Sequence, residues 1–187
     1  MQSEVWQNKG LADALNKGDL AVMPTDTVYG IVARAEDPAA VARVYEARRR
    51  NPDKPCIILI AGPEEAEKFS IKVSEIQKEK LSGFWPGPVS VILDCPVDEF
   101  AYLHRGTNTL AFRVPGAEEL RELLRKTGPL IAPSANTEGN PISLNIEEAR
   151  RYFGSLVGWY ADGGDISGKA SRVVRLYPDG SVDIIRE

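Results

Sequence analysis

Residues 37–60 read DPAAVARVYEARRRNPDKPCIILI and join a predicted helix to a predicted buried strand through a basic turn. Asp37 predicts the start of the helix, because its side chain can accept hydrogen bonds from the free N–H groups of the first turn, where Pro38 is also tolerated. The apolar stripe that faces the core then ends in an arginine, at positions Val41, Val44, Tyr45 and Arg48. The closing run of four apolar residues is typical of a buried strand.

Helices and strands alternate on both sides of this unit, although not strictly. Apolar spacing predicts helices at residues 4–17, 38–50, 64–69, 73–81, 116–126 and 145–153. It predicts strands at residues 20–23, 57–60, 89–93, 109–114, 130–132, 157–161, 171–176 and 182–185. The irregular alternation favours an α/β protein of α+β-like character, with a twisted mixed sheet and flanking helices, over a regular doubly wound fold.

The composition, with 43% apolar and 27% charged residues, is that of a soluble globular protein, and 187 residues fit a single domain over positions 1–187. No apolar run approaches the ~18 residues of a membrane span, and residues 1–4 carry no secretory pattern. Cys56, Cys95 and the single histidine, His104, are too few and too scattered for a zinc set. We therefore expect reduced thiols, no metal site and a cytoplasmic location.

The net charge of −4 argues against a module whose main partner is bare nucleic acid. It leaves room for a local basic cleft. Residues 48–54 are one candidate for phosphate binding, since three arginines and Lys54 stand on a proline-stiffened turn beside the core. Cations at a helix C-terminus can equally be solvated and favoured only by the helix dipole. Polar residues 25–27 and 134–136 also follow predicted strands, which is where open α/β sheets build ligand sites.

A second candidate for phosphate binding is the segment 163–169, which has the spacing G-x-x-x-x-G-K. A true P-loop continues with Ser or Thr and opens a helix, whereas here Ala170 follows and residues 171–176 have the pattern of a strand. We therefore interpret this segment as a flexible glycine-rich loop between two strands.

Five motifs in order give the chain a family resemblance: PTDTVYG (24–30), YEARRR (45–50) followed by KP (54–55), FWPGP (84–88), FRVP (112–115) and APSAN (132–136). Together they closely resemble the YrdC/TsaC family of threonylcarbamoyl-adenylate synthases, over nearly the whole chain. The resemblance implies a YrdC-like fold with a large concave cleft, in the minimal single-domain form.

The resemblance also implies an activity, that of a nucleotidyltransferase. L-Threonine, bicarbonate and ATP would give L-threonylcarbamoyl-adenylate and pyrophosphate, with Mg²⁺ held by the nucleotide phosphates. A downstream threonylcarbamoyl-transfer complex would then modify adenosine 37 of tRNA, and weak direct binding of tRNA is left open. Such chemistry needs positioning and charge neutralisation more than a covalent nucleophile.

Site residues follow from the matched motifs. The L-threonine contacts implied by the resemblance are Thr27 and Arg113, the latter on the substrate carboxylate. The ATP contacts implied by it are Arg50, Lys54, Thr109, Ser134, Asn136 and Ser171. Arg48 and Arg50 are the expected electrostatic catalysts, because guanidinium groups suit bidentate phosphate contacts.

The chain departs from the family pattern at two positions. Arg48 stands where the family usually has lysine, and Leu59 where longer relatives carry a threonine-contacting histidine. Two other hypotheses also stay open. One is a non-catalytic module of the same fold that binds double-stranded RNA or tRNA, and the other is a paralogue with a different carbamoyl-type acceptor, although Thr27 and Arg113 favour an amino acid.

Overall fold

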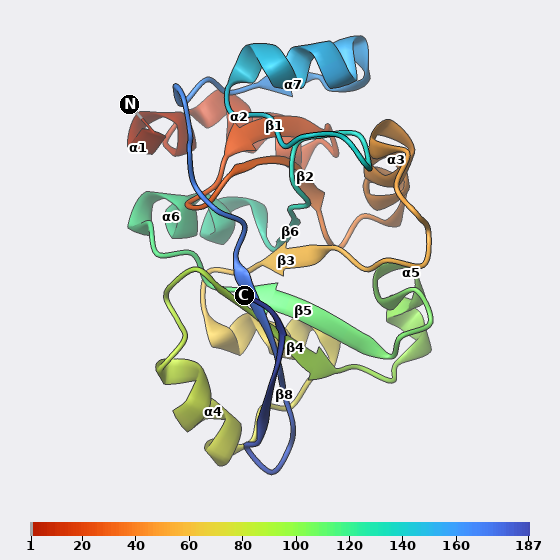
Figure 1. Cartoon of the computed structure of the whole chain (residues 1–187), viewed down its shortest axis with the longest axis vertical. Coiled ribbons are helices and arrows are strands. Elements are labelled where there is room, and N and C mark those ends of the chain that lie inside the picture. Colours follow the sequence, from red (N-terminus) through yellow and green to blue (C-terminus); the bar gives the residue numbers. More distant parts are fainter. Residues whose placement is uncertain (1) are drawn as a thin grey trace.

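Nine strands form one twisted mixed sheet in the computed structural model, which describes residues 2–187 (Figure 1). Met1, the first residue of the predicted domain, lies outside the described residues. The strands are β1 Ala21–Pro24, β2 Tyr29–Arg34, β3 Ile57–Leu59, β4 Val89–Asp94, β5 Thr109–Arg113, β6 Leu130–Ile131, β7 Trp159–Tyr160, β8 Arg172–Leu176 and β9 Val182–Arg186. Their order is β7-β1-β2-β6-β3-β5-β4-β8-β9. The predicted mixed sheet is therefore confirmed: β3 and β5 are parallel, whereas β4 and β5 are antiparallel.

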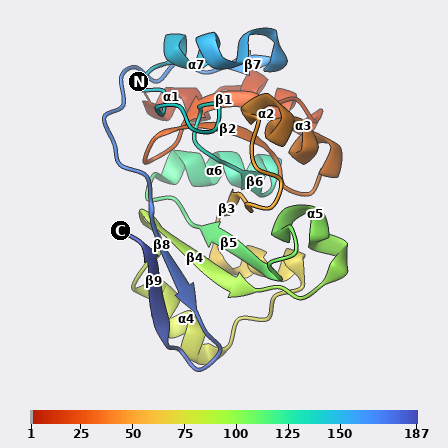
Figure 2. The same ribbon diagram turned by 45° about the vertical axis from the view of Figure 1, so that its right-hand side comes forward.

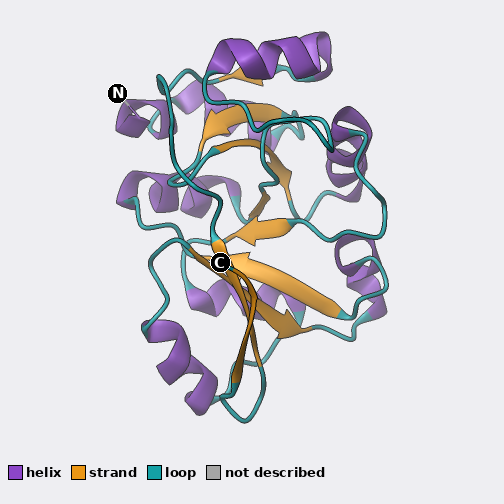
Figure 3. Cartoon of the chain, in the orientation of Figure 1, coloured by secondary structure: helices purple, strands orange, loops and turns teal. Residues whose placement is uncertain are grey.

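Helices surround this sheet (Figure 3). The α-helices are α1 Gln2–Trp6, α2 Lys9–Asn16, α3 Pro38–Arg48, α4 Glu75–Ser82, α5 Ala101–His104, α6 Glu118–Thr127 and α7 Ile146–Phe153. Short 3₁₀ helices are η1 Pro63–Phe69, η2 Asp98–Phe100 and η3 Gly154–Leu156. Figure 2 shows the β8–β9 hairpin at one edge of the molecule, next to the C-terminus. None of the helices among residues 2–187 combines the length and the apolar character needed to cross a membrane.

Three sequence predictions need correction. The helix expected at residues 4–17 is broken after Trp6, because Asn8 accepts a hydrogen bond from Gly10 N (2.8 Å) and caps a new helix. Residues 64–69 form the 3₁₀ helix η1. Strand β2 was not predicted; it is buried along almost its whole length, but Gly30 interrupts the apolar run that would mark a buried strand.

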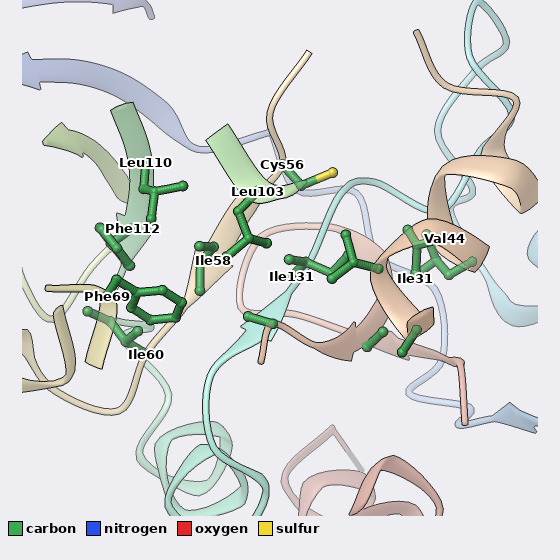
Figure 4. Close-up of a cluster of buried hydrophobic side chains, with 14 of the residues drawn as sticks. Ile31, Val44, Cys56, Ile58, Ile60, Phe69, Leu103, Leu110, Phe112 and Ile131 are labelled. Carbon is green, nitrogen blue, oxygen red and sulfur yellow. The ribbon is translucent and has the colours of Figure 1, made fainter. Parts of the chain in front are cut away.

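The core on one face of the sheet is built around Phe69. Its ring centroid lies 5.3 Å from that of Phe112 and 5.4 Å from that of Phe100. Figure 4 shows Ile58, Ile60, Leu110 and Phe112 gathered around it. Phe112 is paired in register with Ile58 of β3 and with Val91 of β4, so the central strands deliver one apolar face to this cluster.

Replacing Phe112 by alanine should lower the free energy of unfolding by about 3–5 kcal/mol, because the side chain is fully buried and the space it leaves cannot be refilled. Urea denaturation monitored by circular dichroism measures this change. Ile185→Ala is the matched control: that side chain is 57% exposed on β9, and its loss should change stability by less than about 0.5 kcal/mol. Equal effects of the two substitutions would contradict this assignment of the core.

Candidate active site

The face of the central strands opposite Phe69 forms the floor of a cavity of about 340 Å³. Alternate residues of β5 reach it, namely Thr109, Ala111 and Arg113, because successive side chains of a strand point to opposite faces. Ala111 is paired in register with Ile57 of β3 and Ile92 of β4, which also line the cavity. The sheet thus separates a packed core from an open site. The family resemblance implies a large concave cleft, which is a larger feature than this cavity and stays a prediction.

Loops that follow or precede the strands provide the walls. The lining includes Thr25 and Thr27 from the β1–β2 turn, Arg50 and Cys56 from the α3–β3 turn, Ser134 after β6, and Ser171 before β8. Of the nine predicted site residues, six lie on the lining: Thr27, Arg50, Thr109, Arg113, Ser134 and Ser171. The other three are not on the lining: Arg48 is the last residue of α3, and Lys54 and Asn136 lie on loops that carry lining residues. Segments more than 100 residues apart therefore meet at one site.

Arg113 is held in a buried ion pair. Its guanidinium donates to Asp26, and the second oxygen of Asp26 accepts from Gly116 N at 2.8 Å. Burial lowers the pKa of Arg113, and the charge of Asp26 opposes that shift. Beside it, the hydroxyl oxygens of Thr25 and Thr27 lie 3.1 Å apart. This corner combines a fixed cation with hydroxyl groups, which suits the carboxylate and polar side chain of an amino acid.

Arg48 is directed into the protein and does not line the cavity. It is 3% exposed; its Nε donates to Asn136 O at 2.9 Å and its Nη2 to Asn136 Oδ1 at 3.0 Å. Burial, and next the charge of Arg50, lowers the pKa of Arg48 to about 10. Arg48 therefore braces the loop that carries Ser134 and Asn136, while its predicted electrostatic role in catalysis stays a prediction.

Arg50 and Lys54 form the basic rim of the cavity. Arg49 ends α3 in the left-handed conformation (φ 50°), which turns the chain so that Arg50 can donate to Lys54 O at 3.0 Å and to Pro55 O at 2.9 Å. The Lys54 ammonium pairs with Glu138 at 2.8 Å. The predicted basic turn is thus an ordered structure beside the lining.

Ser171 and Arg186 form the opposite wall. The hydroxyl oxygens of Ser171 and Ser90 lie 2.9 Å apart, and Arg186 Nη2 donates to Ser171 O at 2.6 Å. Arg186 lines the cavity but was not predicted as a site residue. Its only sequence signal is a basic residue near the end of a short, exposed strand, which is too common to identify a site.

The glycine-rich segment 163–169, here called the strap, crosses over Thr27. As predicted, it is a loop that leads into strand β8. Tyr29 Oη accepts from Gly163 N and donates to Gly164 O, both at 2.9 Å. Gly168 passes so close to Thr27 that a Cβ there would lie 1.9 Å from the Thr27 carbonyl oxygen. His104 is 3% exposed as the last residue of α5, where its Nδ1 accepts from Gly106 N at 3.1 Å, and it lies off the cavity lining.

A cavity on one sheet face, lined by apolar side chains with a few hydroxyl groups and arginines, has the usual form of a small-molecule site in an α/β domain. Residues 13–187 match the family model Sua5_yciO_yrdC, whose description is "Telomere recombination". The chain therefore belongs to the Sua5/YciO/YrdC family, as its motifs predicted.

Three relatives illustrate the similarity. A protein of Mycobacterium leprae named a putative threonylcarbamoyl-AMP synthase is 34% identical over 181 residues, which cover 95% of this chain and 82% of the relative. The threonylcarbamoyl-AMP synthase of Pyrococcus abyssi is 34% identical over 177 residues, which cover 92% of this chain and 52% of the relative. The structure of P. abyssi Sua5 complexed with L-threonine is 32% identical with a TM-score of 0.81, covering 94% of this chain and 52% of that one. The chain thus spans about half the length of the P. abyssi protein.

Replacing Arg48 by methionine should lower the free energy of unfolding by about 1–3 kcal/mol, because the Asn136 carbonyl would lose its buried donor. Arg49→Met is the matched control, since Arg49 is an exposed neighbour in the same turn. Chemical denaturation of both variants checks the difference. If both lost the same stability, Arg48 would not be the brace of the 134–136 loop.

Proposed function

We propose that this chain synthesises L-threonylcarbamoyl-AMP from L-threonine, bicarbonate and ATP and releases pyrophosphate. The observation that carries the proposal is the single cavity in which Arg113 and Thr27 share a lining with Arg50 and Ser134. An amino acid and a nucleotide could lie in it side by side along β5. The names of the curated relatives and the L-threonine bound to P. abyssi Sua5 support the same activity.

The two ends of the cavity floor are far enough apart to contact different substrate groups. Thr109 and Arg113 are four residues apart on one strand, which corresponds to roughly 13 Å at the usual strand rise. Arg113 would bind the threonine carboxylate, with Thr27 close by. Thr109, Ser134 and Asn136 would hold the nucleotide, and Arg50 and Lys54 its phosphates.

The reaction depends mainly on holding its substrates in the correct positions. The neutral threonine amine forms a C–N bond to the carbon of carbon dioxide and loses a proton, or to that of bicarbonate with loss of water, and gives a carbamate. A carbamate oxygen then attacks the α-phosphorus in line, a new P–O bond forms, and the bond to pyrophosphate breaks. Fixed cations at the phosphates neutralise the negative charge that builds up on the leaving group. Arg50 would supply one such cation, and its hydrogen bonds to Lys54 O and Pro55 O support this role because they hold the guanidinium at the rim.

Magnesium would enter on the phosphates of ATP. Asp26, the one carboxylate in the PTDTVYG motif, is already engaged by Arg113 and Gly116 N, so it suits a structural role better than a metal-ligand role. The product would pass to a threonylcarbamoyl-transfer complex that modifies tRNA. The family resemblance supports both the magnesium on the phosphates and the later transfer step.

Pyrophosphate release tests the proposal directly. Purified protein with magnesium, ATP, L-threonine and bicarbonate should release pyrophosphate, and omission of any one substrate should abolish the release. Release at the background rate with all substrates present would contradict the proposed function.

Substitution of Arg113 should weaken the binding of threonine. Arg113→Lys keeps the charge but loses the planar fork, so the KM for threonine should rise roughly 10- to 100-fold, with a much smaller change in the KM for ATP. The control is Arg175→Lys, whose side chain pairs with Asp94 and does not line the cavity. An unchanged threonine dependence in Arg113→Lys would show that this arginine does not grip the carboxylate.

Substitution of Arg50 should act on ATP instead. Arg50→Ala removes the cation that lines the cavity at the basic rim, so the KM for ATP should rise by roughly tenfold or more while the KM for threonine changes little. Arg49→Ala serves as the control, and steady-state kinetics with each substrate varied measures the split. A selective effect on threonine would place the phosphates elsewhere.

A further inference from the structure

The loop that follows Asn136 brings a carboxylate onto the basic turn. One oxygen of Glu138 accepts from Lys54 Nζ at 2.8 Å, and the other accepts from the backbone N–H of Asn51. Both donors belong to the turn between α3 and β3, whose cations are the proposed phosphate contacts. The carboxylate therefore occupies an anion-binding arrangement made of an ammonium group and a backbone N–H.

This contact is held in place by the backbone. Glu138 N donates to Arg48 O at 2.9 Å, at the last residue of α3, so the loop is fixed to the helix end. Arg48 in turn donates to Asn136, two residues earlier in the same loop. The hydrogen bond from Lys54, and next that from Asn51 N, lowers the pKa of the Glu138 carboxyl, with a further contribution from Arg50. Glu138 is thus a charged group at neutral pH in a defined position.

The contact lies where a polyphosphate would meet the protein. Pro55 and Arg50, on either side of Lys54 in the chain, both line the cavity. The Lys54 side chain is 59% exposed and that of Glu138 28% exposed, so solvent reaches the pair and an incoming anion could exchange with the carboxylate. A triphosphate carries more negative charge than a single carboxylate and can engage Arg50 as well.

We propose that Glu138 fills a phosphate subsite formed by Lys54 Nζ and Asn51 N–H in the nucleotide-free protein, and that the terminal phosphates of ATP replace it there. The inference rests on the proposed function, since it deepens the ATP site of that reaction. Glu138 then sets the affinity for ATP: part of the binding free energy of the phosphates is used to break its contacts. The same exchange leaves the amino-acid corner at Arg113 untouched.

Glu138→Gln tests the exchange, because it removes the charge and keeps the shape. Calorimetric titration should show ATP and inorganic pyrophosphate binding roughly three- to tenfold more tightly to this variant than to the unaltered protein. Adenosine, which lacks phosphates, should bind equally well to both. Glu118→Gln is the matched control: Glu118 pairs with Arg121 and Arg125 on α6, away from the cavity lining, and its loss should leave ATP affinity unchanged.

A Lys54→Met background tests whether the effect of Glu138 on ATP binding depends on Lys54. In Lys54→Met, the further change Glu138→Gln should no longer tighten ATP binding, and Glu138→Ser should reproduce the gain seen with glutamine. Unchanged or weaker ATP binding by both Glu138 variants would overturn the inference while leaving the proposed function standing. Failure of the unaltered protein to bind ATP at all would contradict the proposed function and this inference together.

Discussion

The register of β5 between β3 and β4 is the constraint on which the site depends. It places Phe112 opposite Ile58 and Val91 in the core, and Ala111 opposite Ile57 and Ile92 on the cavity floor. A slip by one residue would exchange the two faces, burying Arg113 among aromatic rings and exposing Phe112 to the cavity. The apolar packing that stabilises the sheet therefore also fixes the direction of the side chains that would meet substrate.

Two of the cations around that floor are paired with carboxylates of the chain. Arg113 is buried with Asp26, and Lys54 lies against Glu138 at the rim. A buried charge without a partner is destabilising. The Asp26 carboxylate therefore offsets the loss of water around the Arg113 guanidinium. The second pair is more exposed and better suited to exchange. The two ends of the site thus differ in exposure, with a buried pair at the proposed amino-acid end and a solvent-accessible pair at the proposed phosphate end.

Much of this organisation could be predicted from the sequence, because local patterns carry it. Residues 37–60 have their cap, apolar stripe and strand in the chain itself, and α3 and β3 lie there. The partners of Arg48 could not be predicted, since Asn136 is 88 residues away and only the fold brings them together. Strand β2 was not predicted because Gly30 interrupts its apolar run, and Arg186 was not predicted because nothing local distinguishes it. The segment 163–169 is the opposite case, because it has the spacing of a P-loop but leads into a strand and not into a helix.

We propose that one sheet face binds the amino acid and the nucleotide together. A crystal structure of the protein with L-threonine and a non-hydrolysable ATP analogue tests this. We expect the threonine carboxylate on Arg113 and the triphosphate at Arg50 and Lys54, with the nucleotide over Ala111 and Glu138 displaced from Lys54. A nucleotide bound at the 163–169 strap, or a threonine bound away from Arg113, would contradict it.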